Sequence, residues 1–125
     1  MNTHTANLLE ALLFGHCWEY SDYNEEDVSI YDFDQSTIIR LESFIEAFEN
    51  VLEEKMPVAY ERIDELERSF GGNLYFSLSG HGCGFFDERD EELAKIHEVA
   101  KKFAPYLFEQ VEIVESADGK LALEY

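Results

Sequence analysis

Basic residues are scarce in this chain of 125 residues, which holds 9 Lys and Arg against 28 Asp and Glu and carries a formal net charge of -19. No Lys or Arg precedes Arg40, although eight carboxylates do. Because contacts to phosphate groups need Lys and Arg, this deficit argues against direct binding to DNA, RNA or anionic lipid. An excess of one charge also makes a compact chain repel itself. We therefore expect the acidity to serve a partner, first of all a protein that normally binds polyanions.

Cysteines and long apolar runs are also few. Cys17 and Cys83 do not make a disulfide framework. No stretch approaches the roughly 18 apolar residues that cross a bilayer, and residues 1–10 lack the basic and apolar parts of a secretory signal. We therefore expect a reducing cytoplasm and no membrane partner. The hydrophobic content of 46% is too high for a disordered acidic tail, so residues 1–125 are predicted to fold as a single domain.

Helical periodicity dominates the first half of the chain. A first helix is predicted to begin after Thr5 or Asn7, with a buried face formed by Leu8, Leu9, Leu12 and Leu13. A long second helix is predicted to begin after Asp34 or Ser36. Its expected core residues are Ile38, Leu41, Ile45, Phe48 and Leu52. A third helix is predicted over residues 58–69, and Gly71-Gly72 is expected to end the helical half.

The second half shows a different period. Apolar and polar residues alternate over 73–79, which predicts a half-buried strand, followed by a Gly-rich turn and a short returning strand over 83–86. A helix capped by Asp87 or Asp90 is expected to run to Ala104. The Asp118-Gly119 pair predicts a hairpin between residues 111–116 and 120–125. The predicted fold class is therefore α+β, with N-terminal helices packed on a small antiparallel sheet.

An acidic surface is the main candidate binding site. Helical spacing places four carboxylates of the second helix in one stripe, namely Glu42, Glu46, Glu49 and Glu53. The preceding loop adds Asp22, Glu25, Glu26, Asp27, Asp32 and Asp34. Together they are predicted to replace phosphates against the Lys and Arg of a partner. The alternative is an ordinary solvated helix face, which is common in soluble proteins.

The glycine-rich segment 79–87 is the densest local motif. Gly80, His81, Gly82 and Gly84 are predicted to form a structural turn, because glycine permits positive φ. The alternative is a nucleophile and base formed by Cys83 and His81. A zinc site formed by His16, Cys17, His81 and Cys83 would lack the ligand spacing usual for zinc knuckles. We therefore expect no metal and no cofactor.

The same segment carries a resemblance to a known family. The sequence reads LYFSL over residues 74–78 and GHGCGFFD over 80–87, and an acidic segment precedes it at residues 24–34. This order resembles small acidic proteins encoded by phages and prophages, in which a strand DFWLTRN continues into GHGAGFWD. The chain departs from that pattern at residues 77–79 and at Phe86, so no role of the family's arginine is carried over. The resemblance implies a phage-type accessory protein in a bacterial cytoplasm and no particular mechanism.

Acidity and resemblance together predict a non-enzymatic inhibitor. The expected partner is a basic nucleic-acid-binding protein of the host, such as a restriction or CRISPR effector or another DNA-binding protein. The alternative prediction is a small enzyme or ligand-binding protein centred on the glycine-rich turn.

Overall fold

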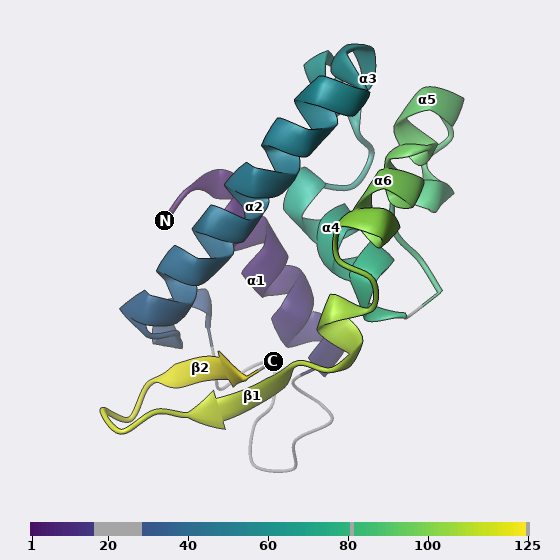
Figure 1. The fold of residues 1–125 in the computed structure, drawn as a ribbon. Coiled ribbons are helices and arrows are strands. Elements are labelled where there is room, and N and C mark those ends of the chain that lie inside the picture. Colours follow the sequence, from purple (N-terminus) through teal and green to yellow (C-terminus); the bar gives the residue numbers. More distant parts are fainter. Residues whose placement is uncertain (17–28, 81, 125) are drawn as a thin grey trace.

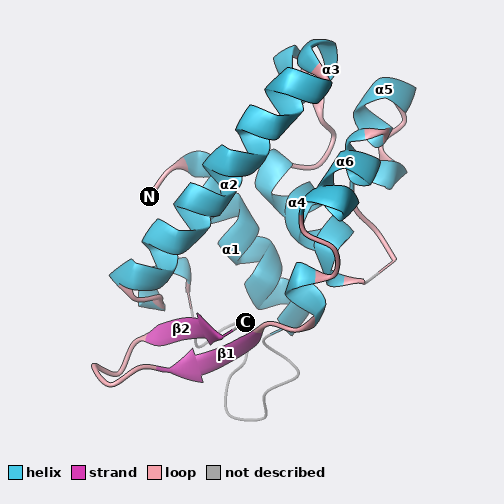
Figure 2. Ribbon diagram, in the orientation of Figure 1, coloured by secondary structure: helices cyan, strands magenta, loops and turns pink. Residues whose placement is uncertain are grey.

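A computed structural model describes residues 1–16, 29–80 and 82–124 and shows helices with a small two-stranded antiparallel sheet at one end (Figures 1 and 2). The α-helices are α1 (Thr3–His16), α2 (Gln35–Lys55), α3 (Pro57–Glu61), α4 (Phe70–Ser79), α5 (Glu91–Ala94) and α6 (Ile96–Phe103). Short 3-10 turns are η2 (Ile30–Asp32), η3 (Ile63–Glu65), η4 (Phe85–Asp87) and η5 (Leu107–Glu109). The strands are β1 (Glu112–Glu115) and β2 (Leu121–Glu124). The α+β prediction is confirmed.

The two long N-terminal helices form where the apolar spacing predicts them. All four leucines of the predicted α1 face and all five predicted core residues of α2 are buried. Asp34 caps α2 by accepting the Thr37 N–H at 2.8 Å, as expected for a helix N-cap. Helix α1 begins earlier than predicted. Its cap is Asn2, whose side-chain oxygen accepts the Thr5 N–H at 2.8 Å, and not Thr5 or Asn7.

The C-terminal hairpin is also confirmed. Its two strands pair antiparallel from Glu112 opposite Glu124 to Glu115 opposite Leu121. The connection has its expected glycine at positive φ, with Gly119 at 82°. The hairpin contacts the start of α2, because the Asp34 N–H donates to the Leu121 carbonyl at 2.8 Å. The sheet therefore covers one end of the helical core (Figure 2).

The strand predicted over residues 73–79 is wrong, because these residues belong to helix α4. The pair Gly71-Gly72, expected to end the helical half, instead lies in the first turn of α4, where Ser69 accepts the Gly72 N–H at 3.1 Å. Every residue of α4 except Phe76 is buried. A helix enclosed on all sides has no polar face, so its apolar and polar residues show no helical period.

Glycine lets α1 and α4 approach closely. A β-carbon at Gly71 would overlap the carbonyl oxygen of His4 and would lie 2.7 Å from the Leu8 nitrogen. These two backbones cannot move independently of the core beneath them, since Leu8 and Leu74 are both fully buried. The contact therefore requires glycine at this position.

The remaining predicted elements are shorter than the sequence indicates. The helix expected over 58–69 ends at Glu61, and the backbone then passes through η3 before Ser69 begins α4. The strand expected over 83–86 is absent, since the described residues there form a bend and the start of η4. The helix expected up to Ala104 is divided at Lys95 into α5 and α6, and Asp90 caps it as predicted.

Candidate functional site

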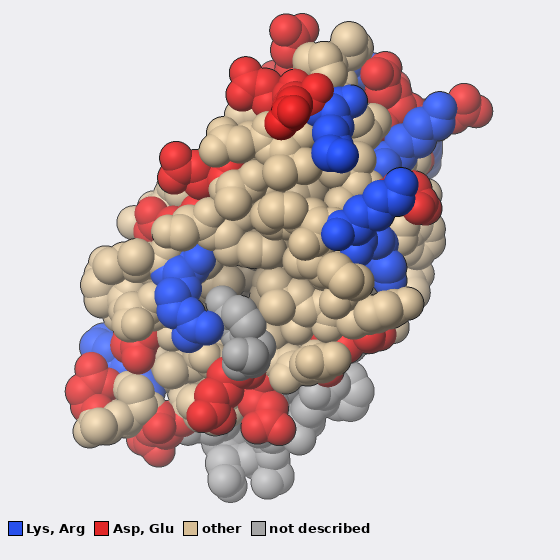
Figure 3. All heavy atoms as spheres, in the orientation of Figure 1, with Lys and Arg blue, Asp and Glu red and all other residues tan. Residues whose placement is uncertain are grey.

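The acidic stripe of α2 is present on the surface. Glu46 and Glu53 are exposed, whereas Glu42 and Glu49 are half-buried. At about 100° per residue the four side chains fall within about 60° of arc, and they span roughly 16 Å of the helix axis. In Figure 3, carboxylates follow the edge of the molecule along α2. The stripe is therefore a continuous row of negative charge beside the buried face of the helix.

No basic side chain of α2 interrupts the stripe. The helix carries Arg40 and Lys55, and both lie about 150° around the axis from the centre of the stripe. The polar contact to the stripe comes instead from Tyr60 on α3, whose hydroxyl donates to Glu49 Oε2 at 3.0 Å. Burial, and then the contact with Glu49, raise the pKa of Tyr60. Tyr60 is thus held in its neutral form and orients Glu49 without cancelling its charge.

Two of the six predicted loop acids, Asp32 and Asp34, lie within the described residues, and both also bind backbone amides. Asp32 accepts the Ser29 N–H at 2.8 Å and so closes η2, and Asp34 caps α2. Both carboxylates are therefore occupied by backbone amides at the start of α2, although Asp32 is exposed. The other four predicted loop acids, Asp22, Glu25, Glu26 and Asp27, lie outside the described residues.

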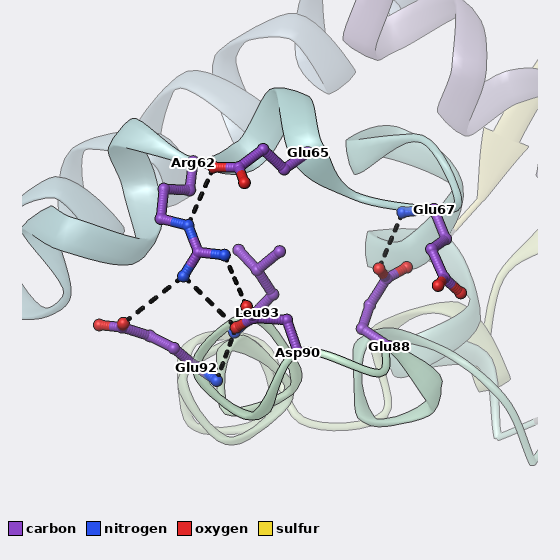
Figure 4. Close-up of polar contacts among 7 residues, drawn as sticks. All are labelled: Arg62, Glu65, Glu67, Glu88, Asp90, Glu92 and Leu93. Carbon is purple, nitrogen blue, oxygen red and sulfur yellow. Dashed lines mark hydrogen bonds and ion pairs between the residues drawn. The ribbon is translucent and has the colours of Figure 1, made fainter.

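A second group of carboxylates surrounds Arg62, which sequence reasoning did not find. Figure 4 shows its guanidinium directed at α5, where it contacts Asp90 at 2.5 Å and Glu92 at 3.8 Å, and it also contacts Glu65 at 2.9 Å. The hydrogen bond from Arg62 lowers the pKa of Asp90 and raises that of the guanidinium. Glu65 is a local partner three residues from Arg62, but Asp90 and Glu92 lie far away in sequence, so no local spacing predicts their contact with Arg62. Its single cation compensates only part of the acidity around it.

Glu88 is a buried carboxylate with a structural role. The residue is 8% exposed, and its carboxylate accepts the Glu67 N–H at 2.8 Å (Figure 4). It also accepts the Arg68 N–H at 3.2 Å and the Asn73 side-chain amide at 3.0 Å. Burial opposes the ionised form, but these hydrogen bonds outweigh it and lower the pKa of Glu88. Residues 67 and 68, which the sequence predicted as helical, therefore have a different role. The amides of Glu67 and Arg68 bind this carboxylate instead of helical carbonyls.

The glycine-rich turn has the predicted backbone. Gly80, Gly82 and Gly84 all have positive φ, at 76°, 78° and 144°. A β-carbon at Gly84 would overlap the Ser77 hydroxyl and lie 2.7 Å from the Ser77 nitrogen. The Gly84 N–H donates to Asp87 at 3.0 Å, which closes the turn into η4. His81 lies outside the described residues, and Cys83 is a half-buried free thiol.

Ser77 and His97 form a serine–histidine contact that the sequence did not reveal. The Ser77 hydroxyl accepts the Phe85 N–H at 2.9 Å and meets His97 Nδ1 at 3.0 Å. Ser77 is only 3% exposed and lies beneath Gly84, so no substrate reaches its oxygen. Burial lowers the pKa of His97, whose ring also packs edge-on against Phe86. The pair connects α4, η4 and α6 and is not arranged as a nucleophile with its base.

Neither a metal site nor a membrane span is found in the part of the chain that the structure describes. No three His, Cys, Asp or Glu side chains converge there as ligands, and none of its helices combines the length and apolarity needed to cross a bilayer. Comparisons with known proteins gave no match to a family model, a curated protein or a solved structure.

Proposed function

We propose that this protein is a non-enzymatic inhibitor that occupies the nucleic-acid-binding groove of a basic host protein. The observation that carries the proposal is the uninterrupted carboxylate stripe of α2, formed by Glu42, Glu46, Glu49 and Glu53. The net charge of -19 supports it, because a strong field of one sign accelerates association with an oppositely charged groove.

The spacing of the stripe supports the mimicry of a phosphate row in charge density. Successive glutamates lie about 5 to 6 Å apart along the helix. A DNA strand carries one phosphate per roughly 3.4 Å of axis, or about five over the length of the stripe. Four carboxylates therefore present a comparable density of charge without reproducing individual phosphate positions. A groove lined with long Lys and Arg side chains tolerates that difference, because these side chains adapt to the position of an anion.

The setting of the proposal is a bacterial cytoplasm during phage or prophage expression. The resemblance of the segment 80–87 to phage-encoded acidic proteins supports this setting, and the partner class that follows is a restriction or CRISPR effector or another DNA-binding protein. A nucleophile at Cys83 is not part of the proposal, because its predicted base, His81, lies outside the described residues.

The test begins with capture of basic proteins from a bacterial lysate, followed by competition with DNA. A labelled DNA duplex is bound to the captured protein, and its displacement by the acidic chain is followed by fluorescence anisotropy. Displacement should weaken steeply with added salt, since exposed charges are screened over about 8 Å at physiological ionic strength. Replacing all four stripe glutamates by glutamine should raise the concentration needed for displacement about tenfold or more. Each lost ion pair between a glutamate and a cation of the partner is expected to cost a few tenths to about 1 kcal/mol.

A matched control separates the stripe from overall charge. The control neutralises four other exposed glutamates near the hairpin, namely Glu109, Glu112, Glu115 and Glu124. Both variants change the net charge equally, and glutamine at position 49 can still accept the Tyr60 hydroxyl. Equal losses in the two variants, or displacement that does not depend on salt, would contradict the proposal.

A further inference from the structure

A pocket of about 320 Å³ lies between the C-terminal half of α2 and helix α6. Its lining residues are Val51, Lys55, Glu98, Val99, Lys102 and Phe103. In Figure 3, basic side chains lie at the end of α2 and over α6, with neutral surface between them and carboxylates beside each. The pocket lies on the flank of α2 that is roughly opposite the acidic stripe, since Lys55 is about 150° from the centre of that stripe.

The two lysines of the pocket have no ion-pair partner among the described residues of this strongly acidic protein. No carboxylate oxygen of residues 1–16, 29–80 or 82–124 lies within 4.0 Å of the ammonium group of Lys55 or Lys102. This holds even for Glu98, which is four residues before Lys102 on α6 and usually would pair with it. Two lysines therefore line the pocket without a direct ion pair among the described residues, although Glu98 lines it as well.

The floor of the pocket is apolar and built on the core. Val51, Val99 and Phe103 are half-buried. The centroid of the Phe103 ring lies 5.6 Å from the ring centroids of both Phe44 and Phe48, so the position of the ring is set by aromatic packing. An apolar group entering the pocket would meet a preformed surface, which lowers the entropic cost of binding.

We propose that this pocket binds a small amphipathic anion, with its apolar part against Val51, Val99 and Phe103 and its single negative charge between Lys55 and Lys102. A volume of about 320 Å³ is at the lower end of ordinary ligand pockets and suits a short aliphatic or aromatic tail. Glu98, which also lines the pocket, and the large negative charge of the chain repel polyanions. The ligand class is therefore a monoanion with an apolar tail, and nucleic acid is excluded from this site.

The probe for this site is decanoate, compared with decyltrimethylammonium, which has the same tail and the opposite charge. Titration of each into the isotopically labelled chain, followed by NMR, should shift the amides of Val51 and Val99 with decanoate at one equivalent. Decyltrimethylammonium should bind at least tenfold more weakly. The double variant K55Q/K102Q should bind decanoate about tenfold less tightly than the original chain, because it loses two charge contacts. The control K95Q/K120Q makes the same charge change away from the pocket lining and should bind decanoate unchanged.

A charge-reversed pocket keeps the test independent of stability. Val99→Glu places a carboxylate in the pocket on a half-buried helical position. It should abolish decanoate binding and strengthen decyltrimethylammonium binding, a reversal that an unfolded variant would not show. Equal affinity of the original chain for both amphiphiles, or full decanoate binding by K55Q/K102Q, would overturn the proposal. Self-association that is lost specifically in K55Q/K102Q, measured by sedimentation, would instead make the pocket a contact between copies and would also overturn it.

Discussion

Replacing Glu88 by glutamine is the sharpest test of how this fold is held together. The carboxylate accepts three hydrogen bonds. Two come from the backbone N–H groups of Glu67 and Arg68, and one comes from the side-chain amide of Asn73. Glutamine keeps one acceptor oxygen and replaces the other by an NH₂ group. At least one of the three donors would then face another donor.

The expected cost follows from the number of donors left without an acceptor. A buried donor that loses its acceptor costs about 1–3 kcal/mol. One or two donors lose theirs, depending on the orientation of the amide, and the relief from burying a charge offsets part of the loss. We therefore expect Glu88→Gln to lower the free energy of unfolding by about 2–4 kcal/mol at pH 7.

The effect should depend on pH in a defined direction. The folded-state pKa of Glu88 is below its ordinary value of 4.5, so its contribution to stability is fully present above pH 4.5. The contribution is lost as the pH falls through the depressed folded-state pKa. The difference in unfolding free energy between the original chain and Glu88→Gln should thus be constant near neutral pH and should narrow below about pH 4.5.

The assay is urea unfolding followed by circular dichroism at a series of pH values. The matched control is Glu67→Gln, which leaves the Glu67 backbone donor in place and removes only an exposed ion pair with Arg89 at 3.5 Å. That control should change the unfolding free energy by about 0–1 kcal/mol. A loss below about 1 kcal/mol for Glu88→Gln, or one that persists unchanged at pH 3, would refute the reasoning.

Three further predictions concern the helix contacts and the turn. Gly71→Ala should force α1 and α4 apart and lower the unfolding free energy by about 1–3 kcal/mol, measured by calorimetry, and an unchanged melting temperature would contradict the close contact. Gly84→Val should lower the unfolding free energy by more than about 2 kcal/mol, because it combines backbone strain with overlap on Ser77. Gly82→Val meets open space and should cost only about 1–2 kcal/mol, from backbone strain alone. Equal losses of the two variants in urea unfolding would argue against the overlap at Gly84. Since burial lowers the pKa of His97 below 6.5, stability should fall as the pH drops below 6.5, and His97→Gln should flatten that dependence between pH 7 and pH 5 in thermal melts.

Patterns within one element were readable from the sequence. The apolar spacing of α1 and α2 identified their buried faces, and Asp118-Gly119 identified the hairpin, because side chains a few residues apart in a helix or turn have a set geometry whatever surrounds them. The acidic stripe of α2 was readable for the same reason. The alternation of apolar and polar residues over 73–79 led to a wrong strand prediction, because the same pattern occurs in a fully enclosed helix and in a half-buried strand. Only the packing of α1 and α6 around α4 distinguishes the two.

Composition and local spacing therefore determined the strong acidity, the α+β class and the position of the carboxylate stripe. Tertiary structure decided which carboxylates take part in long-range contacts, since Asp90 pairs with Arg62 and Glu88 is a buried acceptor for the amides of Glu67 and Arg68. It also brought Lys55 and Lys102 to one apolar pocket from separate helices. Contacts between residues far apart in the chain depend on how the elements pack in space, and no sequence period carries that information.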